Sequence, residues 1–146
     1  MKVLSLDHNS FSGTLPSSIG KMSSIQYLDI QANELTGTIP KEVLEISGLQ
    51  SLDLSDQKGF GLSGSLPRGF ISNQLQTLDL SGNSFSGSVP DDFLSSSIEA
   101  SKFSLDLSSN LLTGELPGNL SRFPMMNIDF SDNKITSISC KCIYSI

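Results

Sequence analysis

The sequence contains no tryptophan, one histidine, two cysteines and only 16% charged residues. Because the two cysteines, Cys140 and Cys142, both lie near the end of the chain, they cannot form a disulfide framework. Lysine and arginine number 9 against 15 aspartates and glutamates, so the formal net charge is −6. This balance leaves no basic surface for phosphates, which argues against nucleic acid as a partner.

Long apolar runs are also missing. No segment approaches the roughly 20 apolar residues that cross a bilayer, and the first residues lack the apolar run of a signal peptide. Hydrophobic residues make up 37% of the 146 residues, which together with glycine is the share of a globular protein. We therefore expect one folded domain that makes no membrane contact.

The chain repeats itself. A pair of hydrophobic residues separated by one position recurs at intervals of 23–27 residues. The six pairs are Leu4/Leu6, Leu28/Ile30, Leu52/Leu54, Leu78/Leu80, Leu105/Leu107 and Ile128/Phe130. An amide side chain follows three positions after each pair, as Asn9, Asn33, Gln57, Asn83, Asn110 and Asn133. The pattern is L-x-x-L-x-L-x-x-N-x-L in six successive copies.

A second block, L-x-G-x-[ILV]-P with Phe or Leu first, follows the amide in five of the six repeats. Its copies are Phe11–Pro16, Leu35–Pro40, Leu62–Pro67, Phe85–Pro90 and Leu112–Pro117. Together the two motifs resemble the plant-specific leucine-rich repeats found in ectodomains of receptor-like kinases, in receptor-like proteins and in polygalacturonase inhibitors. The resemblance spans Val3 to about Ile138.

This resemblance implies an α/β solenoid, a right-handed superhelix of about six leucine-rich repeats. Alternation along each strand sends the paired hydrophobic residues inward, so the strands must stack into one parallel, concave sheet to bury them. We expect residues 1–146 to form a single domain with a degenerate C-terminal tail at 138–146. The cysteine-stapled caps usual in the family are missing, so we also expect a fragment of a longer array.

The amides predict an inward-facing ladder that bonds to main-chain groups at the turn after each strand, including those of the next coil. The glycine of the second block permits unusual backbone angles, and the proline after it opens a helical turn on the convex side. Frequent serine and glycine favour 3₁₀ or single helical turns there. Apolar pairs should pack inward from them: Ile19/Met22, Val43/Ile46 and Leu120/Phe123.

The third and fifth repeats depart from the pattern. Gln57 replaces the asparagine, and three extra residues fall within Lys58–Gly61, which predicts a bulging loop. We expect Phe60 to fold back over its coil; the alternative is an exposed contact residue. In the fifth repeat Lys102 occupies a position that is usually leucine, so that coil should enter its strand irregularly.

The candidate binding surface is the open face of the concave sheet. The residue between the paired hydrophobics is aspartate in the last five repeats, at Asp29, Asp53, Asp79, Asp106 and Asp129. Strands about 4.8 Å apart turn these into a ladder, which could receive a basic peptide or a cation, although such aspartates are also common background in the subclass. With the flanking polar columns, the candidate ligand-binding residues are Tyr27, Asp29, Gln31, Ser51, Asp53, Ser55, Thr77, Asp79, Ser81, Asp106 and Ser108.

The sequence contains no motif that indicates catalysis. His8 has no identifiable nucleophile partner, and neither a G-x-S-x-G elbow nor a phosphate-binding glycine loop occurs. Cys140 and Cys142 are too close in sequence for an unstrained disulfide. Free thiols are the expectation, with bonding to another segment or chain as the alternative. We expect no enzyme activity, cofactor or metal site.

The resemblance implies a recognition module, similar to the extracellular ligand-binding domain of a receptor in signalling or defence. Its partner would be a protein or peptide, with a co-receptor or self-association through uncapped ends as further possibilities. The alternative is an inhibitor of a secreted cell-wall-degrading enzyme. Ice or polysaccharide binding through serine and threonine columns is weaker, because aspartate interrupts each strand. An extracellular or cell-surface location follows from the resemblance, and Asn119 lies in a glycosylation sequon.

Overall fold

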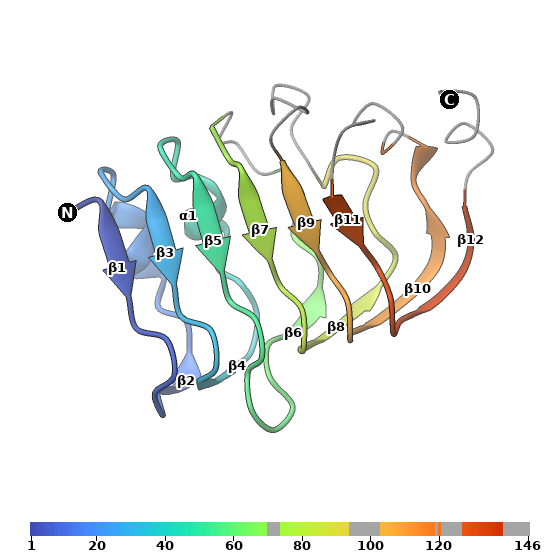
Figure 1. The fold of residues 1–146 in the computed structure, drawn as a ribbon, viewed down its shortest axis with the longest axis horizontal. Coiled ribbons are helices and arrows are strands. Elements are labelled where there is room, and N and C mark those ends of the chain that lie inside the picture. The colour runs from blue at the N-terminus through green and yellow to red at the C-terminus, as the bar shows by residue number, and fades with distance from the viewer. Residues whose placement is uncertain (70–73, 94–102, 119, 121–126, 139–146) are drawn as a thin grey trace.

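The computed structural model describes residues 1–69, 74–93, 103–118, 120 and 127–138. Within these residues the chain winds in successive coils, and each coil contributes one strand to a six-stranded parallel sheet (Figure 1). Sheet order follows chain order, as the repeats predict. The strands are β1 (Val3–Ser5), β3 (Tyr27–Asp29), β5 (Ser51–Asp53), β7 (Thr77–Asp79), β9 (Ser104–Asp106) and β11 (Asn127–Asp129).

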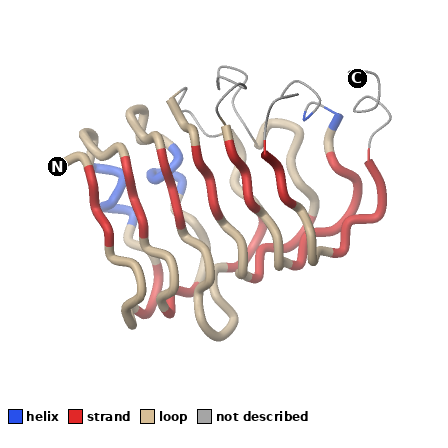
Figure 2. Tube along the Cα trace, in the orientation of Figure 1, coloured by secondary structure: helices blue, strands red, loops and turns tan. Residues whose placement is uncertain are grey.

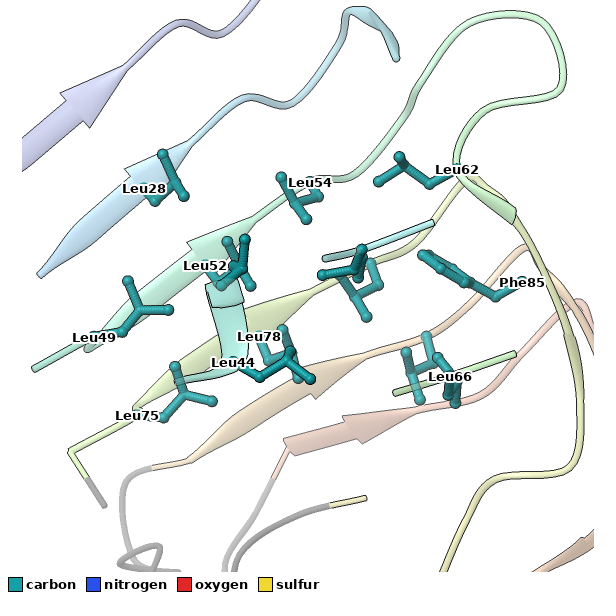
Figure 3. Close-up of a cluster of buried hydrophobic side chains, with 14 of the residues drawn as sticks. Leu28, Leu44, Leu49, Leu52, Leu54, Leu62, Leu66, Leu75, Leu78 and Phe85 are labelled. Atoms are coloured by element: carbon teal, nitrogen blue, oxygen red, sulfur yellow. The ribbon is translucent and has the colours of Figure 1, made fainter. Parts of the chain in front are cut away.

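Equivalent leucines lie opposite one another in this sheet. Leu52 pairs with Leu28 on one side and with Leu78 on the other, and Leu78 pairs in turn with Leu105. All four are at most 1% exposed, and the inward leucines of adjacent coils lie together in the core (Figure 3). The predicted burial of one hydrophobic row between stacked coils is therefore confirmed.

The amide ladder is present, and from Asn33 onward each rung has four equivalent partners, whereas Asn9 in the first coil donates only to the carbonyls of Leu6 and Asp7. Asn83 donates to the carbonyls of Leu80 and Ser81 in its own coil and to that of Leu54 in the preceding coil. Its oxygen accepts the Leu62 N–H at 2.8 Å. The ladder thus bonds to the preceding coil and not to the next one, because the turn leaves main-chain groups unpaired on that side.

Short helices cover the far side of the sheet from the open face near the N-terminus (Figure 2). The 3₁₀ helix η1 (Ser17–Lys21) and the single-turn α1 (Lys41–Leu44) each begin directly after a proline, as predicted. Val43 and Ile46 are buried, while Ile19 and Met22 are partly buried. Leu120 is half-buried; Phe123 and Lys102 lie outside the described residues.

A second set of parallel strands occupies the L-x-G-x-[ILV]-P blocks, for which the sequence predicts no strand. β2 (Ser12–Thr14) pairs with β4 (Glu34–Thr36), and a bridge from Gly37 to Leu62 continues the pairing. The remaining strands form a four-stranded sheet of β6 (Ser63–Ser65), β8 (Ser84–Gly87), β10 (Leu111–Leu116) and β12 (Lys134–Ile138). Pairing arises because the same block, with alternating buried and exposed residues, recurs at the same place in each coil. We call these strands the second sheet.

The expected bulge is present, but Phe60 does not fold back over its coil. Its side chain is 88% exposed, which contradicts our expectation. The loop is instead held through the main chain: Lys58 N–H donates to the Asn33 carbonyl at 2.8 Å, and the Ser84 hydroxyl donates to the Phe60 carbonyl.

The C-terminal end extends the second sheet. Ile138, the first residue of the predicted tail, still belongs to β12. Residues 139–146, including Cys140 and Cys142, lie outside the described residues.

Candidate functional site

The structure brings the predicted binding residues onto one face of the six-stranded parallel sheet, which we call the main sheet. Tyr27, Ser51 and Thr77 are direct partners on β3, β5 and β7. The aspartates pair in the same way from Asp29 through Asp53 and Asp79 to Asp106. Among the described residues, no helix lies over this face (Figure 1). Side chains that are 24–27 residues apart in sequence therefore form adjacent rungs of one surface.

The aspartate column has a structural task in addition to its charge. Each carboxylate accepts the main-chain N–H two residues further on, which closes a side-chain turn at the end of the strand. The bond measures 3.0 Å from Ser55 to Asp53 and from Ser81 to Asp79. Gln31, Ser108 and Ser131 make the equivalent bonds to their aspartates. Only part of each carboxylate is therefore left for a ligand.

The aspartates differ in how readily they ionise. Burial raises the pKa of Asp53, and repulsion from Asp79 and Asp29 adds to this, although bonds from Ser55 act in the opposite direction. At the end of the column, hydrogen bonds from Ser131 lower the pKa of the exposed Asp129. Burial and neighbouring charge thus oppose the ionisation of Asp53, whereas hydrogen bonds favour that of Asp129.

The flanking columns are less available than the sequence suggests. Ser55 is only 3% exposed, and its hydroxyl donates to Asp53 at 2.6 Å. Ser81 donates to Asp79 at the same distance but stays half-buried. Gln31, Asp106 and Ser108 are also half-buried. We leave Ser55 out of the proposed contact surface because a ligand cannot reach it.

A shallow hollow of about 430 Å³ lies at the β1–β3–β5 end of the face. Val3, Tyr27, Asp29 and Asp53 contribute to its lining. Tyr27 is 43% exposed, and its hydroxyl donates to the Gln50 side chain at 2.7 Å. The ring is thus fixed, with an apolar surface beside two carboxylates, which suits a side chain that has both an aliphatic stem and a positive charge.

The remaining candidates add no chemistry to this site. His8 lies 3.1 Å from the exposed Asp7 carboxylate. In the described ranges, no three histidine, cysteine, aspartate or glutamate side chains are grouped to hold a metal ion. The same ranges hold no helix with the length and hydropathy of a membrane span. Asn119 lies outside the described residues.

The second sheet presents another polar surface, which we name the hydroxyl array. It carries serine and threonine side chains from five successive coils: Ser12, Thr14, Thr36, Thr38, Ser63, Ser65, Ser86, Ser88 and Thr113. The repeat pattern does not predict this surface, because it indicates strands only at the paired hydrophobic residues. The signal in the sequence is a serine or threonine on each side of the glycine in the first four blocks and before the glycine in the fifth.

Comparison with known families identifies the repeat. Leucine-rich repeat models match residues 1–58, 74–96 and 103–123. No curated protein matches the chain.

Several solved structures have a fold similar to that of almost the whole chain. The ectodomain of the Arabidopsis receptor kinase HAESA, in complex with an IDA peptide hormone, is 31% identical with a TM-score of 0.80 over 92% of this chain. The chain spans 22% of that ectodomain. A chain of the BIR3–SERK2 complex from Arabidopsis thaliana is 33% identical with a TM-score of 0.77, over 93% of this chain and 70% of that one.

A plant ice-binding protein is also similar, at 27% identity with a TM-score of 0.76, over 92% of this chain and 42% of that one. The plant ice-binding protein therefore has the same fold as the receptor ectodomains. The chain belongs to the plant-type leucine-rich repeat proteins.

Proposed function

We propose that the chain is a non-enzymatic recognition module that binds a protein or peptide on the open face of its main sheet, outside the cell. The observation that carries this is the in-register, uncovered face of aligned polar side chains. Two similar structures support it, since HAESA is solved with the IDA peptide hormone and PEPR1 with AtPEP1. HAESA is also solved together with the co-receptor SERK1, which supports a protein partner for such modules.

A basic ligand fits the face best. Asp29, Asp53 and Asp79 lie on adjacent strands, where charges about 4.8 Å apart repel by roughly 0.9 kcal/mol in bulk water. A lysine or arginine of the ligand removes this repulsion, and the fixed ring of Tyr27 packs against its aliphatic stem. Because exposed charges are screened by salt, binding should weaken as ionic strength rises.

The test is a binding screen with immobilised chain, using synthetic basic and acidic peptides and a purified polygalacturonase as soluble probes. Wild type should retain basic peptides, and Asp53→Lys should lose them because it reverses the charge in the middle of the face. Tyr27→Ala should weaken the same interaction through lost packing. Retention of the polygalacturonase alone would instead indicate the enzyme-inhibitor alternative.

Glu45→Lys is the matched control, because it makes the same change of charge on the exposed C-cap residue directly after α1. It should bind as wild type does. Equal binding by wild type, Asp53→Lys and Tyr27→Ala would place the interaction elsewhere and overturn the proposal.

Ice binding is a second candidate function, favoured by the similarity to the plant ice-binding protein. The aspartate column argues against the main sheet as the ice-binding surface, because ionised carboxylates interrupt its hydroxyl columns. A chain that binds ice should therefore use a different face.

A further inference from the structure

The hydroxyl array is regular because neighbouring strands keep a constant offset. Gly13 lies opposite Leu35, and Gly87 lies opposite Leu112, so each strand is displaced by two residues from the one before it. This brings Thr14 opposite Thr36 and Ser65 opposite Ser86. With strands about 4.8 Å apart, the hydroxyls repeat from coil to coil at a fixed spacing.

Within the described residues, most of these hydroxyls have no hydrogen-bond partner. The Thr36 hydroxyl donates weakly to the Gly13 carbonyl at 3.4 Å. The side-chain hydroxyls of the other eight members of the array make no hydrogen bond to a described residue. All members except the half-buried Ser63 are exposed. The hydroxyls of Ser55 and Ser81 on the main sheet are instead used by aspartates.

Glycine keeps the surface between the hydroxyls empty. Gly37 and Gly64 have φ of +80° and +86°, and a Cβ at these positions would approach the methyl groups of Thr14 and Thr38 to 3.0 and 2.9 Å. At these positions the block therefore carries no side chain between its two hydroxyl residues. Charged side chains lie at the borders of the array, at Glu34, which pairs with Lys58 at 3.6 Å, and at Glu115.

We propose that the hydroxyl array is a binding site for ice; this inference rests on the second candidate function. A hydroxyl both donates to and accepts from water. Ordering a liquid water molecule costs up to about 2 kcal/mol, whereas water in ice is already ordered. A rigid and periodic set of unpartnered hydroxyls therefore binds the crystal in preference to the liquid. Many weak hydrogen bonds that form at the same time together give tight binding.

The experiment measures ice binding by the full chain, as thermal hysteresis and as incorporation of labelled protein into a growing ice crystal. Wild type should enter the ice. Ser65→Tyr should lose this property, because a ring in the middle of the array breaks contact with a flat crystal surface. Ser65→Thr keeps the hydroxyl and should retain ice binding. Ser18→Tyr, on the exposed surface of η1, is the matched control and should behave as wild type.

Circular dichroism and urea denaturation establish that each variant is folded. If wild type shows no ice binding, both the candidate function and this site are wrong. If wild type binds ice and Ser65→Tyr binds it equally well, the function stands and the assigned face is wrong. Adsorption to crystalline cellulose in place of ice, with the same loss in Ser65→Tyr, would overturn ice as the ligand.

Discussion

At the scale of single residues, one polar side chain often serves both the fold and the surface. Asp53 accepts two bonds from Ser55 that close the turn after β5, and it also forms the centre of the proposed peptide-binding face. The aspartate column can therefore be retained for structural reasons alone, and the frequency of aspartate between the paired hydrophobics does not by itself identify a ligand.

The pH dependence of stability reports on this double role. Because the pKa of Asp53 is raised in the folded chain, ionisation is less favourable there than in the unfolded chain. Its contribution to stability is therefore full below the usual value of 3.8 and is lost as the pH rises through the folded pKa. We expect Asp53→Asn, which keeps an oxygen for Ser55, to lose less stability than wild type when the pH is raised from 3 to 7.

Urea denaturation at several pH values measures this difference. Asp129→Asn is the contrasting variant, because the pKa of Asp129 is lowered, so its contribution is present above 3.8 and is lost as the pH falls. An identical change in stability with pH for wild type and Asp53→Asn would show that burial of Asp53 has no energetic consequence.

At the scale of elements, the sequence predicts the strands of the main sheet and the short helical turns correctly, because both depend on contacts within one coil or its repeat. The paired hydrophobics indicate β1, β3 and β5 directly, and Pro16 and Pro40 mark the helical turns. These are local patterns with a clear period.

The strands of the second sheet and the exposure of Phe60 could not be derived in the same way. The strands of the second sheet exist only where blocks of neighbouring coils lie side by side. The offset between neighbouring strands depends on the whole stack. Whether Phe60 is exposed depends on long-range main-chain bonds to Asn33 and Ser84. The candidate binding residues share a face as expected, but the burial of Ser55 depends on its bond to Asp53.

The block glycines should differ in how well they tolerate a side chain. Gly13 and Gly64 have nearly equal φ, +83° and +86°, but a Cβ on Gly13 would meet no atom within 4 Å, whereas one on Gly64 would lie 2.9 Å from the Thr38 methyl. Both alanine variants carry backbone strain. We expect Gly64→Ala to cost about 1 kcal/mol more than Gly13→Ala, because it also overpacks the second sheet.

Urea denaturation measures the loss of stability in both alanine variants. Thr38→Ser removes the methyl group that the new Cβ would meet, so the double variant Gly64→Ala/Thr38→Ser should regain the extra stability that Gly64→Ala loses relative to Gly13→Ala. Equal costs for the two glycines, or no recovery in the double variant, would mean that the strands separate freely and that the array is not rigid.

At the scale of the whole molecule, the chain is a stack in which each coil contacts only its neighbours. The main sheet joins each strand to the next in chain order, and the amides from Asn33 to Asn133 each bind their own coil and the preceding one. Stability should therefore be a sum of coil and interface contributions. A surface that depends on several coils, such as either polar face, is then only as ordered as the weakest interface beneath it.

Removal of one core side chain should accordingly have a local effect. Leu52 is 0% exposed, and Leu52→Ala should cost about 3 kcal/mol through lost burial and a cavity. Amide hydrogen exchange should accelerate most at Ile30 and Leu54, whose N–H groups bond across the strands next to it, and least at Leu107, which bonds to Asp129. Leu105→Ala should reverse this order. Uniform acceleration in both variants would show that the coils unfold as a single unit, and the sum of local contributions would then fail.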